Sequence, residues 1–362
     1  MSENAKYWIW LQNVFGYGAK ISKIIDEFGG AKELYNLGET EWRMSSFLTN
    51  RQVEKLISTY IEKGNEVIDY CLQQGYKIVD YDDESYPNRL KDIPDAPAVL
   101  YVDGILPDID NLVTIAMVGS RKASEYAVRV ARVFGKGLTE AGASVISGGA
   151  LGIDSYSHEG ALEGGGQTVA VLGNGFGDSY LDTNRDLRKK ISQNGALVTE
   201  YQPFTKASGR NFPVRNRIIS GLSDVVIVVE AGVKSGSLIT ADHSLEQGRT
   251  VMALPGRVTD VLSMGCNRLI RQGAAVITCM DDILFELGLS EVQNYSVNIK
   301  NSQIKLAKPE KMLYSHLDFN PQSIDDLIRK SGVSFKEAAE CLVRLELAGL
   351  AKRIGGMYVR GK

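Results

Sequence analysis

The chain has 362 residues, enough for two or three domains, and its 44% hydrophobic and 23% charged residues are those of an ordinary globular protein. Its formal net charge of -3 provides no overall attraction to nucleic acid, so a polyanion site would require local clustering of basic side chains. We find no secretory signal and no apolar run long enough to cross a membrane, and we expect a cytoplasmic protein without membrane contact.

The four cysteines and three histidines are widely separated along the chain. They form no CxxC pair and no spacing typical of metal ligands. We therefore expect reduced, buried thiols and predict neither a metal site nor a bound cofactor.

Residues 1–76 have the pattern of several short helices. The segment "FGYG" (Phe15 to Gly18) lies between two stretches with helical spacing of apolar residues. It fits a helix-hairpin-helix or SAM-like unit, whose backbone N–H groups could meet a phosphate. It also fits an ordinary turn between two packed helices, which we favour.

Residues 77–288 alternate between strand and helix patterns. Helices are expected over 124–142, from Asp154, near 181–194 and near 237–247. Strands are expected at 113–120, 143–149, 168–175, 196–201, 224–231, 250–256 and 274–277. Continuous β-branched runs between helices predict an α/β fold, a Rossmann-like doubly wound and mostly parallel sheet. Its ligands should lie beyond the carboxyl ends of the strands.

The C-terminal part predicts a linker over 289–310 and a winged helix over 311–362, because two helices precede a Gly-Gly hairpin. The expected recognition helix, 334–348, carries Lys336 and Arg344 against three glutamates. A net-negative helix reads a major groove poorly. We expect protein contacts here, or weak duplex contacts through Lys352 and Arg353.

Three loops of the middle region could bind anions. "GSRKAS" (119–124) offers glycine, Arg121, Lys122 and the start of a helix. It is not GxGxxG, and no acid ends the second strand, so dinucleotide binding is disfavoured. "SGGALGID" (147–154) forms a tight loop; Asp154 with His158 could do acid–base work, but helix capping is favoured. "KSGS" (234–237) is a phosphate-sized nest before a helix.

The segment "FTKASGRNFPVRNR" (204–217) contains no acidic residue. Its cations are Lys206, Arg210, Arg215 and Arg217. The planar guanidinium group suits phosphate oxygens, and Phe204 and Phe212 could stack on bases. Alternatively, one arginine pairs with Glu200 or Glu230 and holds strand ends together. Several anion nests on one sheet edge suit an extended polyphosphate, such as single-stranded nucleic acid.

Several blocks together resemble the DNA-processing protein A family, DprA or Smf. They are "YPNRLKDIPDAPAVLYVDG", "MVGSRKAS", "SGGALGIDSYSHEGAL", "FPVRNRIISGLSDVVIVVEAGVKSGSLITA" and "ALPG" before "GCNRLI", in order over about residues 80 to 280. The resemblance implies a bacterial protein that binds single-stranded DNA as a homodimer. It would protect incoming DNA and help load the RecA recombinase during natural transformation, without catalysis.

The loops and the resemblance together assign DNA binding to one set of residues. These are Gly119, Ser120, Arg121, Lys122, Gly148, Gly149, Gly152, Asn211, Phe212, Arg215, Asn216, Arg217, Lys234, Ser235, Gly236 and Ser237. The resemblance matches Arg215 to Arg217 to a basic segment of the family, with Asn216 orienting a phosphate or a base.

Two other functions stay open. The sheet is similar to that of nucleoside-monophosphate phosphoribohydrolases, but "KSGSLITADH" lacks the catalytic glutamate of that family, for which only Glu230 or Asp154 could substitute. A transcription regulator acting through the winged helix is opposed by the acidic recognition helix. We therefore predict no catalytic residue.

Overall fold

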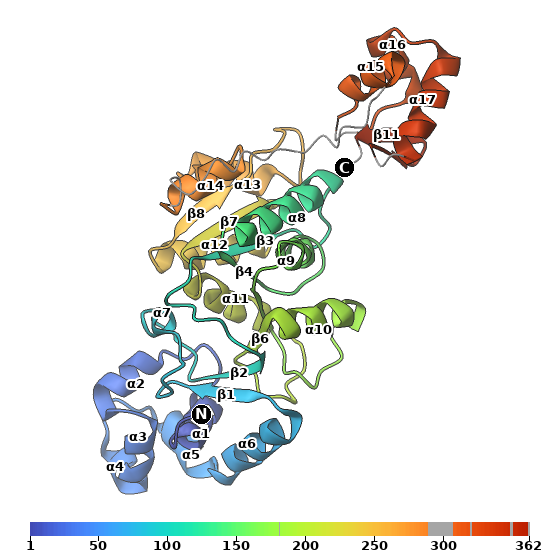
Figure 1. Ribbon diagram of the computed structural model, residues 1–362. Coiled ribbons are helices and arrows are strands. Elements are labelled where there is room, and N and C mark those ends of the chain that lie inside the picture. The colour runs from blue at the N-terminus through green and yellow to red at the C-terminus, as the bar shows by residue number, and fades with distance from the viewer. Residues whose placement is uncertain (181, 289–306, 319–320, 348–349, 361–362) are drawn as a thin grey trace. The chain divides into compact units, whose positions relative to one another are not determined.

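The computed structural model describes residues 1–180, 182–288, 307–318, 321–347 and 350–360. The chain forms two compact units, Met1–Asn294 and Tyr295–Lys362. The first contains N-terminal helices and a large sheet, and the second contains three helices and a hairpin (Figure 1).

The N-terminal helices pack around the aromatic side chains of α1. The helices are α1 (Ala5–Phe15), α2 (Ile21–Phe28), α3 (Ala31–Leu37), α4 (Glu39–Met44), α5 (Asn50–Ser58) and α6 (Glu62–Gln74). Trp8 and Trp10 of α1 are fully buried. The turn after α1 packs against the sheet part of the unit, since the Tyr17 and Tyr201 ring centroids lie 4.4 Å apart. The "FGYG" segment forms the turn between α1 and α2, and the choice between a helix-hairpin-helix and an ordinary turn stays a prediction.

A nine-stranded sheet forms the centre of the first unit, in the order β1-β2-β6-β5-β4-β3-β7-β8-β9. The strands are β1 (Lys77–Asp80), β2 (Val99–Gly104), β3 (Thr114–Gly119), β4 (Ser144–Ser147), β5 (Thr168–Val171), β6 (Gly195–Thr199), β7 (Val225–Glu230), β8 (Thr250–Ala253) and β9 (Ala275–Val276). The pairs β1–β2 and β2–β6 are antiparallel, and the pairs from β6 to β9 are parallel. The mostly parallel sheet is confirmed, with β1 and β2 as an antiparallel extension that the sequence reading missed.

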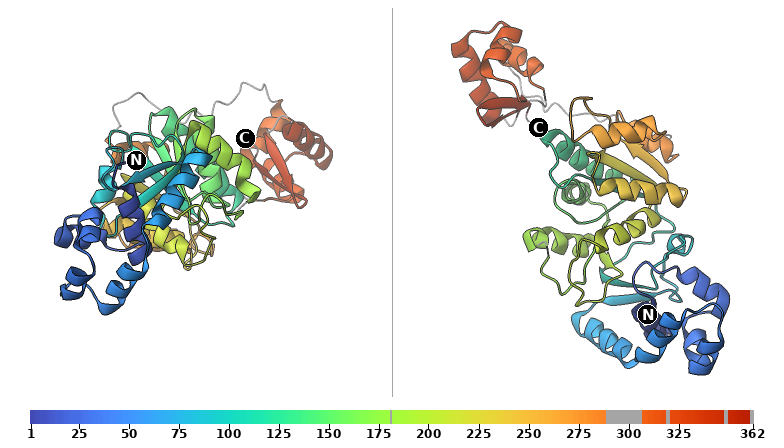
Figure 2. Two further views of the ribbon diagram at one scale, coloured as in Figure 1. Left: turned by 90° about the horizontal axis from the view of Figure 1, so that it is seen from below. Right: turned by 180° about the vertical axis from the view of Figure 1, so that it is seen from behind.

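Helices cover both faces of the sheet, as a doubly wound fold requires (Figures 1 and 2). One face carries α8 (Glu125–Glu140), α9 (Ile153–Glu163), α10 (Arg185–Asn194) and α14 (Met280–Glu286); the other carries α11 (Asn211–Gly221), α12 (Ser237–Glu246) and α13 (Met264–Arg271). Side chains of β3 alternate between the two cores: Ile115 and Met117 enter the core under α8, and Ala116 and Val118 enter the core under α11. The short α7 (Asn88–Lys91) and the 3-10 turn η1 (Asp182–Asn184) complete the unit.

The second unit is a winged helix, as predicted. It contains α15 (Lys308–His316), α16 (Ile324–Ser331), α17 (Phe335–Leu347) and the antiparallel hairpin β10 (Ala351–Ile354) and β11 (Met357–Arg360). Leu313, Leu327 and Leu342 lie in its core. Most of the predicted linker, residues 289–306, lies outside the described residues, and its end at 308–310 is the first turn of α15.

Three of the four cysteines are buried, but Cys279 is exposed before α14, which differs from the expectation of four buried thiols. All four are free thiols. No helix within the described residues is long and apolar enough to cross a membrane.

Candidate nucleic-acid interface

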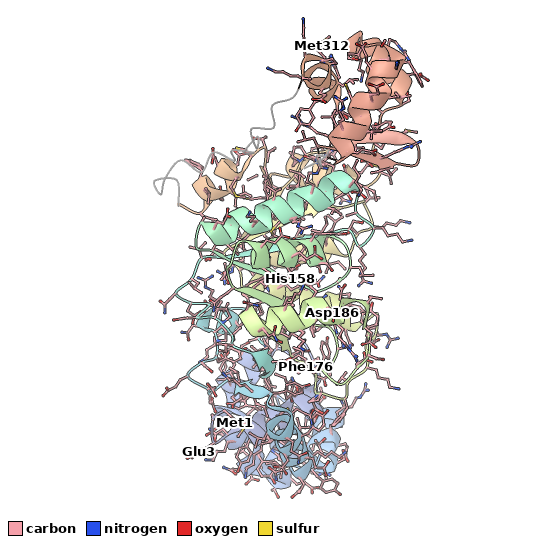
Figure 3. The ribbon with its side chains drawn as sticks, turned by 45° about the vertical axis from the view of Figure 1, so that its right-hand side comes forward. Met1, Glu3, His158, Phe176, Asp186 and Met312 are labelled. Carbon is pink, nitrogen blue, oxygen red and sulfur yellow. The ribbon has the colours of Figure 1, made fainter. Side chains whose placement is uncertain are left out.

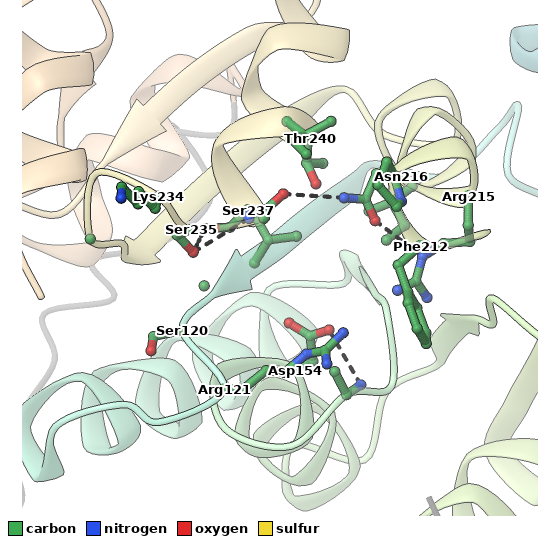
Figure 4. A pocket seen from close by; sticks show the side chains of 18 of the residues that line it. Ser120, Arg121, Asp154, Phe212, Arg215, Asn216, Lys234, Ser235, Ser237 and Thr240 are labelled. Carbon is green, nitrogen blue, oxygen red and sulfur yellow. Dashed lines mark hydrogen bonds between the residues drawn. The ribbon is translucent and has the colours of Figure 1, made fainter. Parts of the chain in front are cut away.

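The site lies where the winding of the sheet reverses. From β3 the chain adds β4, β5 and β6 on one side, and then β7, β8 and β9 on the other. Loops that leave β3 and β7 therefore diverge, which opens a crevice at the carboxyl edge of the strands. A cavity of about 860 Å³ lies there (Figure 4). This is the edge at which the sequence predicts a ligand.

The cavity brings together ten of the sixteen residues that the sequence proposes. Those that line it are Gly119, Ser120, Arg121, Phe212, Arg215, Asn216, Lys234, Ser235, Gly236 and Ser237. The others, which do not line it, are Lys122, Gly148, Gly149, Gly152, Asn211 and Arg217.

Phe212, on the first turn of α11, forms an aromatic surface in the cavity with cations beside it. The guanidinium carbons of Arg121 and Arg215 lie 5.0 and 5.8 Å from its ring centroid. The Tyr180 ring lies 5.4 Å away, tilted by 42°. An aromatic face next to guanidinium groups can stack on a base while the cations attract its phosphate.

Arg215 lies beneath this surface and is only 4% exposed. One terminal nitrogen donates to the carbonyls of Gly148, at 2.8 Å, and Val171. Its Nε donates to Asn216 Oδ1 at 3.1 Å. Burial lowers the pKa of Arg215 to about 10, while Asp154 opposes that shift. Arg215 is therefore a cation fixed in the cavity wall rather than a free arm.

Gly148 contributes to this arrangement without lining the cavity. A Cβ atom there would lie 2.7 Å from Asp154 Oδ2 and 2.8 Å from a terminal nitrogen of Arg215. The space that a side chain would need is filled by the two charged groups. Gly152 (φ 80°) is restricted in a similar way, because a Cβ atom there would lie 2.3 Å from the carbonyl oxygen of Ser120.

Asp154 and His158 do not form the acid–base pair that their spacing allows. Asp154 accepts a hydrogen bond from the Ala150 N–H at 3.3 Å, and burial raises its pKa although Arg215 opposes the shift. His158 instead bonds through Nδ1 to Thr168 Oγ1 at 2.7 Å, and burial lowers its pKa to about 3. Nor does Asp154 cap α9: the N-cap position is Gly152, with Asp154 in the first turn.

Arg217 forms the internal ion pair that was the alternative to DNA binding for one of these arginines. Its two terminal nitrogens donate to the carboxylate oxygens of Glu200 at 2.7 and 2.8 Å, and both side chains are 1% exposed. Its Nε donates to the Asp95 carbonyl at 2.9 Å. Although burial disfavours the charge, Glu200 outweighs it and the pKa of Arg217 is raised. The placement of Arg217 in a DNA groove is therefore corrected: it ties α11 to the end of β6.

The start of α8 also differs from the expectation of free N–H groups aimed at an anion. Ser124 caps the helix by accepting from the Ala127 N–H. Glu230, at the end of β7, accepts from the Ser124 N–H at 2.9 Å and from its hydroxyl at 2.5 Å. A carboxylate of the chain itself therefore occupies this helix terminus. Arg121 and Lys122 remain exposed cations of the loop, and of the two Arg121 lines the cavity.

The turn before α12 lies across the cavity from Phe212 (Figure 4). Lys234 is exposed, and the hydroxyls of Ser235 and Ser237 lie 2.8 Å apart. The first residues of α12 have no side-chain cap. Asn216 fixes the turn by donating to the Gly236 carbonyl at 3.3 Å. The first N–H groups of α12 donate to Ser235 and Gly236, so the Lys234 cation and the two hydroxyls are the groups that suit a phosphate.

Comparison with known proteins identifies the family. Residues 77–288, more than half of the chain, match the family model of the DNA recombination-mediator protein A. The chain belongs to this family. Residues 300–357 match the DprA winged helix domain.

Curated relatives agree with this assignment. The chain is 36% identical to protein Smf of Escherichia coli over 318 residues, covering 86% of this chain and 85% of that protein. It is 41% identical to DNA processing protein DprA of Streptococcus pneumoniae over 204 residues, covering 56% of this chain and 72% of that protein.

Solved structures of DNA processing protein A show the same fold. That of S. pneumoniae aligns with a TM-score of 0.68 at 33% identity, covering 78% of this chain and 97% of that chain. That of Helicobacter pylori, described for its single-stranded DNA binding mode, aligns with a TM-score of 0.54 at 29% identity, covering 59% of this chain and 95% of that chain.

The cavity of this DprA family member has walls that the sequence reading missed. Tyr180 and residues 207–209 line one side, and Val233, Val261 and Leu262 line another. Each follows a predicted strand, and residues 207–209 also lie in the acid-free segment 204–217. Asn211 lies outside the lining, where its side chain donates to the Gly173 carbonyl at 3.0 Å.

Neither acid that could replace a catalytic glutamate is free in this DprA family member. Glu230 holds Ser124, and Asp154 faces Arg215. Within the part of the chain that the structure describes, no three His, Cys, Asp or Glu side chains are grouped to hold a metal ion.

Proposed function

We propose that this protein binds single-stranded DNA in the cavity at the carboxyl edge of its sheet, protects it and helps to load RecA. One observation carries the proposal: Phe212, Arg121 and the Lys234 turn line one cavity, with Arg215 fixed beside the Phe212 ring. Aromatic faces and cations in one groove suit a single strand and do not require a particular base.

The expected contacts divide between backbone and base. Lys234 and the hydroxyls of Ser235 and Ser237 would hold a phosphate on one side, and Arg121 would hold the next on the other. A base between them would stack on Phe212. Because phosphate contacts release counterions, affinity should fall steeply as salt rises.

The family and its relatives support the rest of the proposal. The family description is that of a recombination mediator, and the H. pylori relative is described with a single-stranded DNA binding mode. Delivery of a bound strand to RecA during natural transformation accords with both. It requires no chemistry from the cavity, so we infer a binding protein and not an enzyme.

We also propose a homodimer formed through the last part of the sheet unit. Several apolar side chains between residues 245 and 285 are exposed, among them Phe285 of α14, which is 74% exposed. A second copy packed on α14 would bury that side chain. Phe285→Lys should shift the protein toward monomer in sedimentation, whereas Leu72→Lys, at an exposed position on α6, should not. Equal sedimentation of both variants and wild type would contradict this surface.

Fluorescence anisotropy of a labelled dT oligonucleotide across a salt series tests DNA binding. Arg121→Gln and Lys234→Gln should each weaken binding by about 1–2 kcal/mol and make the salt dependence shallower. Lys122→Gln is the matched control, since Lys122 is an exposed cation on the same loop but outside the cavity lining. Equal losses in all three variants would indicate general electrostatics and not this cavity.

A folded wild-type protein that binds no oligonucleotide would overturn the proposal. The sheet would then be tested for release of the base from nucleoside monophosphates. RecA loading is tested separately, by the lag in RecA ATPase activity on single-stranded DNA covered by a single-strand binding protein. The full chain should shorten that lag, and Arg121→Gln should restore it.

A further inference from the structure

A second cavity, of about 320 Å³, lies beneath α10. It is lined by Asp103 of β2, Phe176 after β5 and Arg188 of α10, and Figure 3 shows Phe176 next to that helix. The two cavities share no lining residue, but Ser179 lines the second and Tyr180 lines the first. One short segment of chain therefore borders both.

Arg188 is a cation without a full set of partners. Its Nε is buried and makes no hydrogen bond within the part of the chain that the structure describes. Burial lowers the pKa of Arg188, and the charges of Asp182 and Asp178 only oppose that shift. Because Arg188 also lines the cavity, its guanidinium group places a positive charge in the cavity wall that a ligand phosphate would stabilise.

The opposite wall offers an acceptor. Burial raises the pKa of the half-buried Asp103 carboxyl, and no cation or hydrogen bond opposes the shift. Beside it, the Tyr76 and Phe176 rings pack with centroids 4.7 Å apart. The cavity therefore combines a donor, an acceptor and an aromatic wall, the three features that bind a nucleobase with its phosphate.

The lining contains three cations at helical spacing together with the carboxylates of Asp103, Asp178 and Asp182. Arg185, Arg188 and Lys189 line the cavity at positions i, i+3 and i+4 of α10. Arg185 reaches only the exposed Asp182, at 3.8 Å, a pair that water screens strongly. The outer cations therefore remain available to a phosphate.

We propose that this second cavity is a nucleotide subsite, which takes a further base and phosphate of the strand held at Phe212. The inference rests on the proposed function and adds to it a place where base identity matters. Asp103 accepts hydrogen bonds, and guanine offers two neighbouring donors on its pairing edge where thymine offers one. The subsite therefore favours guanine over thymine.

The test compares short and long oligonucleotides on the full chain. Anisotropy is measured with dT oligomers of about four and about twelve nucleotides, the second also with one internal dG. Arg188→Gln should weaken binding of the long oligomers about tenfold and leave the short one unchanged. Lys190→Gln, an exposed cation of α10 outside the lining, should change neither. Asp103→Asn, which keeps the shape of the side chain, should abolish the gain from dG.

Other outcomes overturn the inference. If Arg188→Gln and Lys190→Gln act alike, or if short and long oligomers weaken together, Arg188 does not form a separate subsite. If free deoxyguanosine monophosphate binds and Arg188→Gln blocks it, while oligonucleotide affinity is unchanged, the cavity serves a free nucleotide instead. If wild type binds no oligomer of either length, the proposed function itself fails. If only Arg188→Gln loses affinity, and only for the long oligomers, the proposed function stands.

Discussion

Arg217 of α11 and Glu200 at the end of β6 form a bidentate ion pair, with nitrogen–oxygen distances of 2.7 and 2.8 Å. Both side chains are 1% exposed, and Arg217 also donates to the carbonyls of Asp95 and Val214. The pair joins a helix to a strand inside the fold. Two residues earlier, Arg215 lines the cavity.

Arg217→Ala should therefore destabilise the protein and not act on DNA directly. Removing one partner leaves the Glu200 carboxylate buried without a counter-charge, which costs about 3–5 kcal/mol. Denaturant unfolding measures this loss. Arg217→Met with Glu200→Leu, which removes both charges, should recover part of the stability. A stable Arg217→Ala variant that has lost DNA binding would return Arg217 to the site.

Gly148→Ala should destabilise the protein by about 1–3 kcal/mol, because the new methyl group enters the space held by Asp154 and Arg215. Gly209→Ala is the control, since a Cβ atom there meets nothing within 4 Å although Gly209 lines the cavity. Thermal unfolding of both variants checks the expectation. Equal stability of the two would mean that the Asp154–Arg215 arrangement can shift at little cost.

Phe212→Ala should weaken binding to single-stranded DNA by about 1–3 kcal/mol through the loss of a stacking face, with a nearly unchanged salt slope. Phe212→Tyr keeps the ring and should bind nearly as well. Anisotropy at several salt concentrations separates the two effects. If Phe212→Ala changes the salt dependence of the affinity as much as Arg121→Gln does, the ring acts only by positioning Arg121.

His158 should make stability fall on acidification. Its folded pKa is lowered to about 3 by burial, from 6.5, so below pH 6.5 the unfolded chain takes up a proton that the folded chain refuses. The penalty is absent above pH 6.5 and grows by about 1.4 kcal/mol per pH unit as the pH falls toward 3.

Denaturant unfolding between pH 7.5 and about 5 measures that slope. His158→Gln removes the titrating ring, so its stability should vary less with pH over this range, whatever its stability at neutral pH. Parallel curves for the variant and wild type would exclude His158 as the origin.

Local sequence patterns determined the element order of this protein. The strands from β3 to β9 and the helices α8, α9, α10 and α12 were predictable because β-branched runs and helical periodicity are properties of neighbouring residues. The same holds for the winged helix. β1 and β2 were missed because they pair antiparallel and precede the alternation of strands and helices that identifies the parallel strands.

Only the tertiary structure showed that Arg215 and Arg217 lie in different environments. The sequence analysis placed Arg215 and Arg217 together in the DNA-binding segment 204–217, whereas in the structure both lie on α11, which begins at Asn211. Residues two apart on a helix point about 200° from each other, so one arginine faces the cavity and the other the interior. Tyr180, Asp103 and Arg188 likewise gain their positions from loops and strands that meet only in the folded chain. Contacts between distant segments depend on packing, which no local pattern encodes.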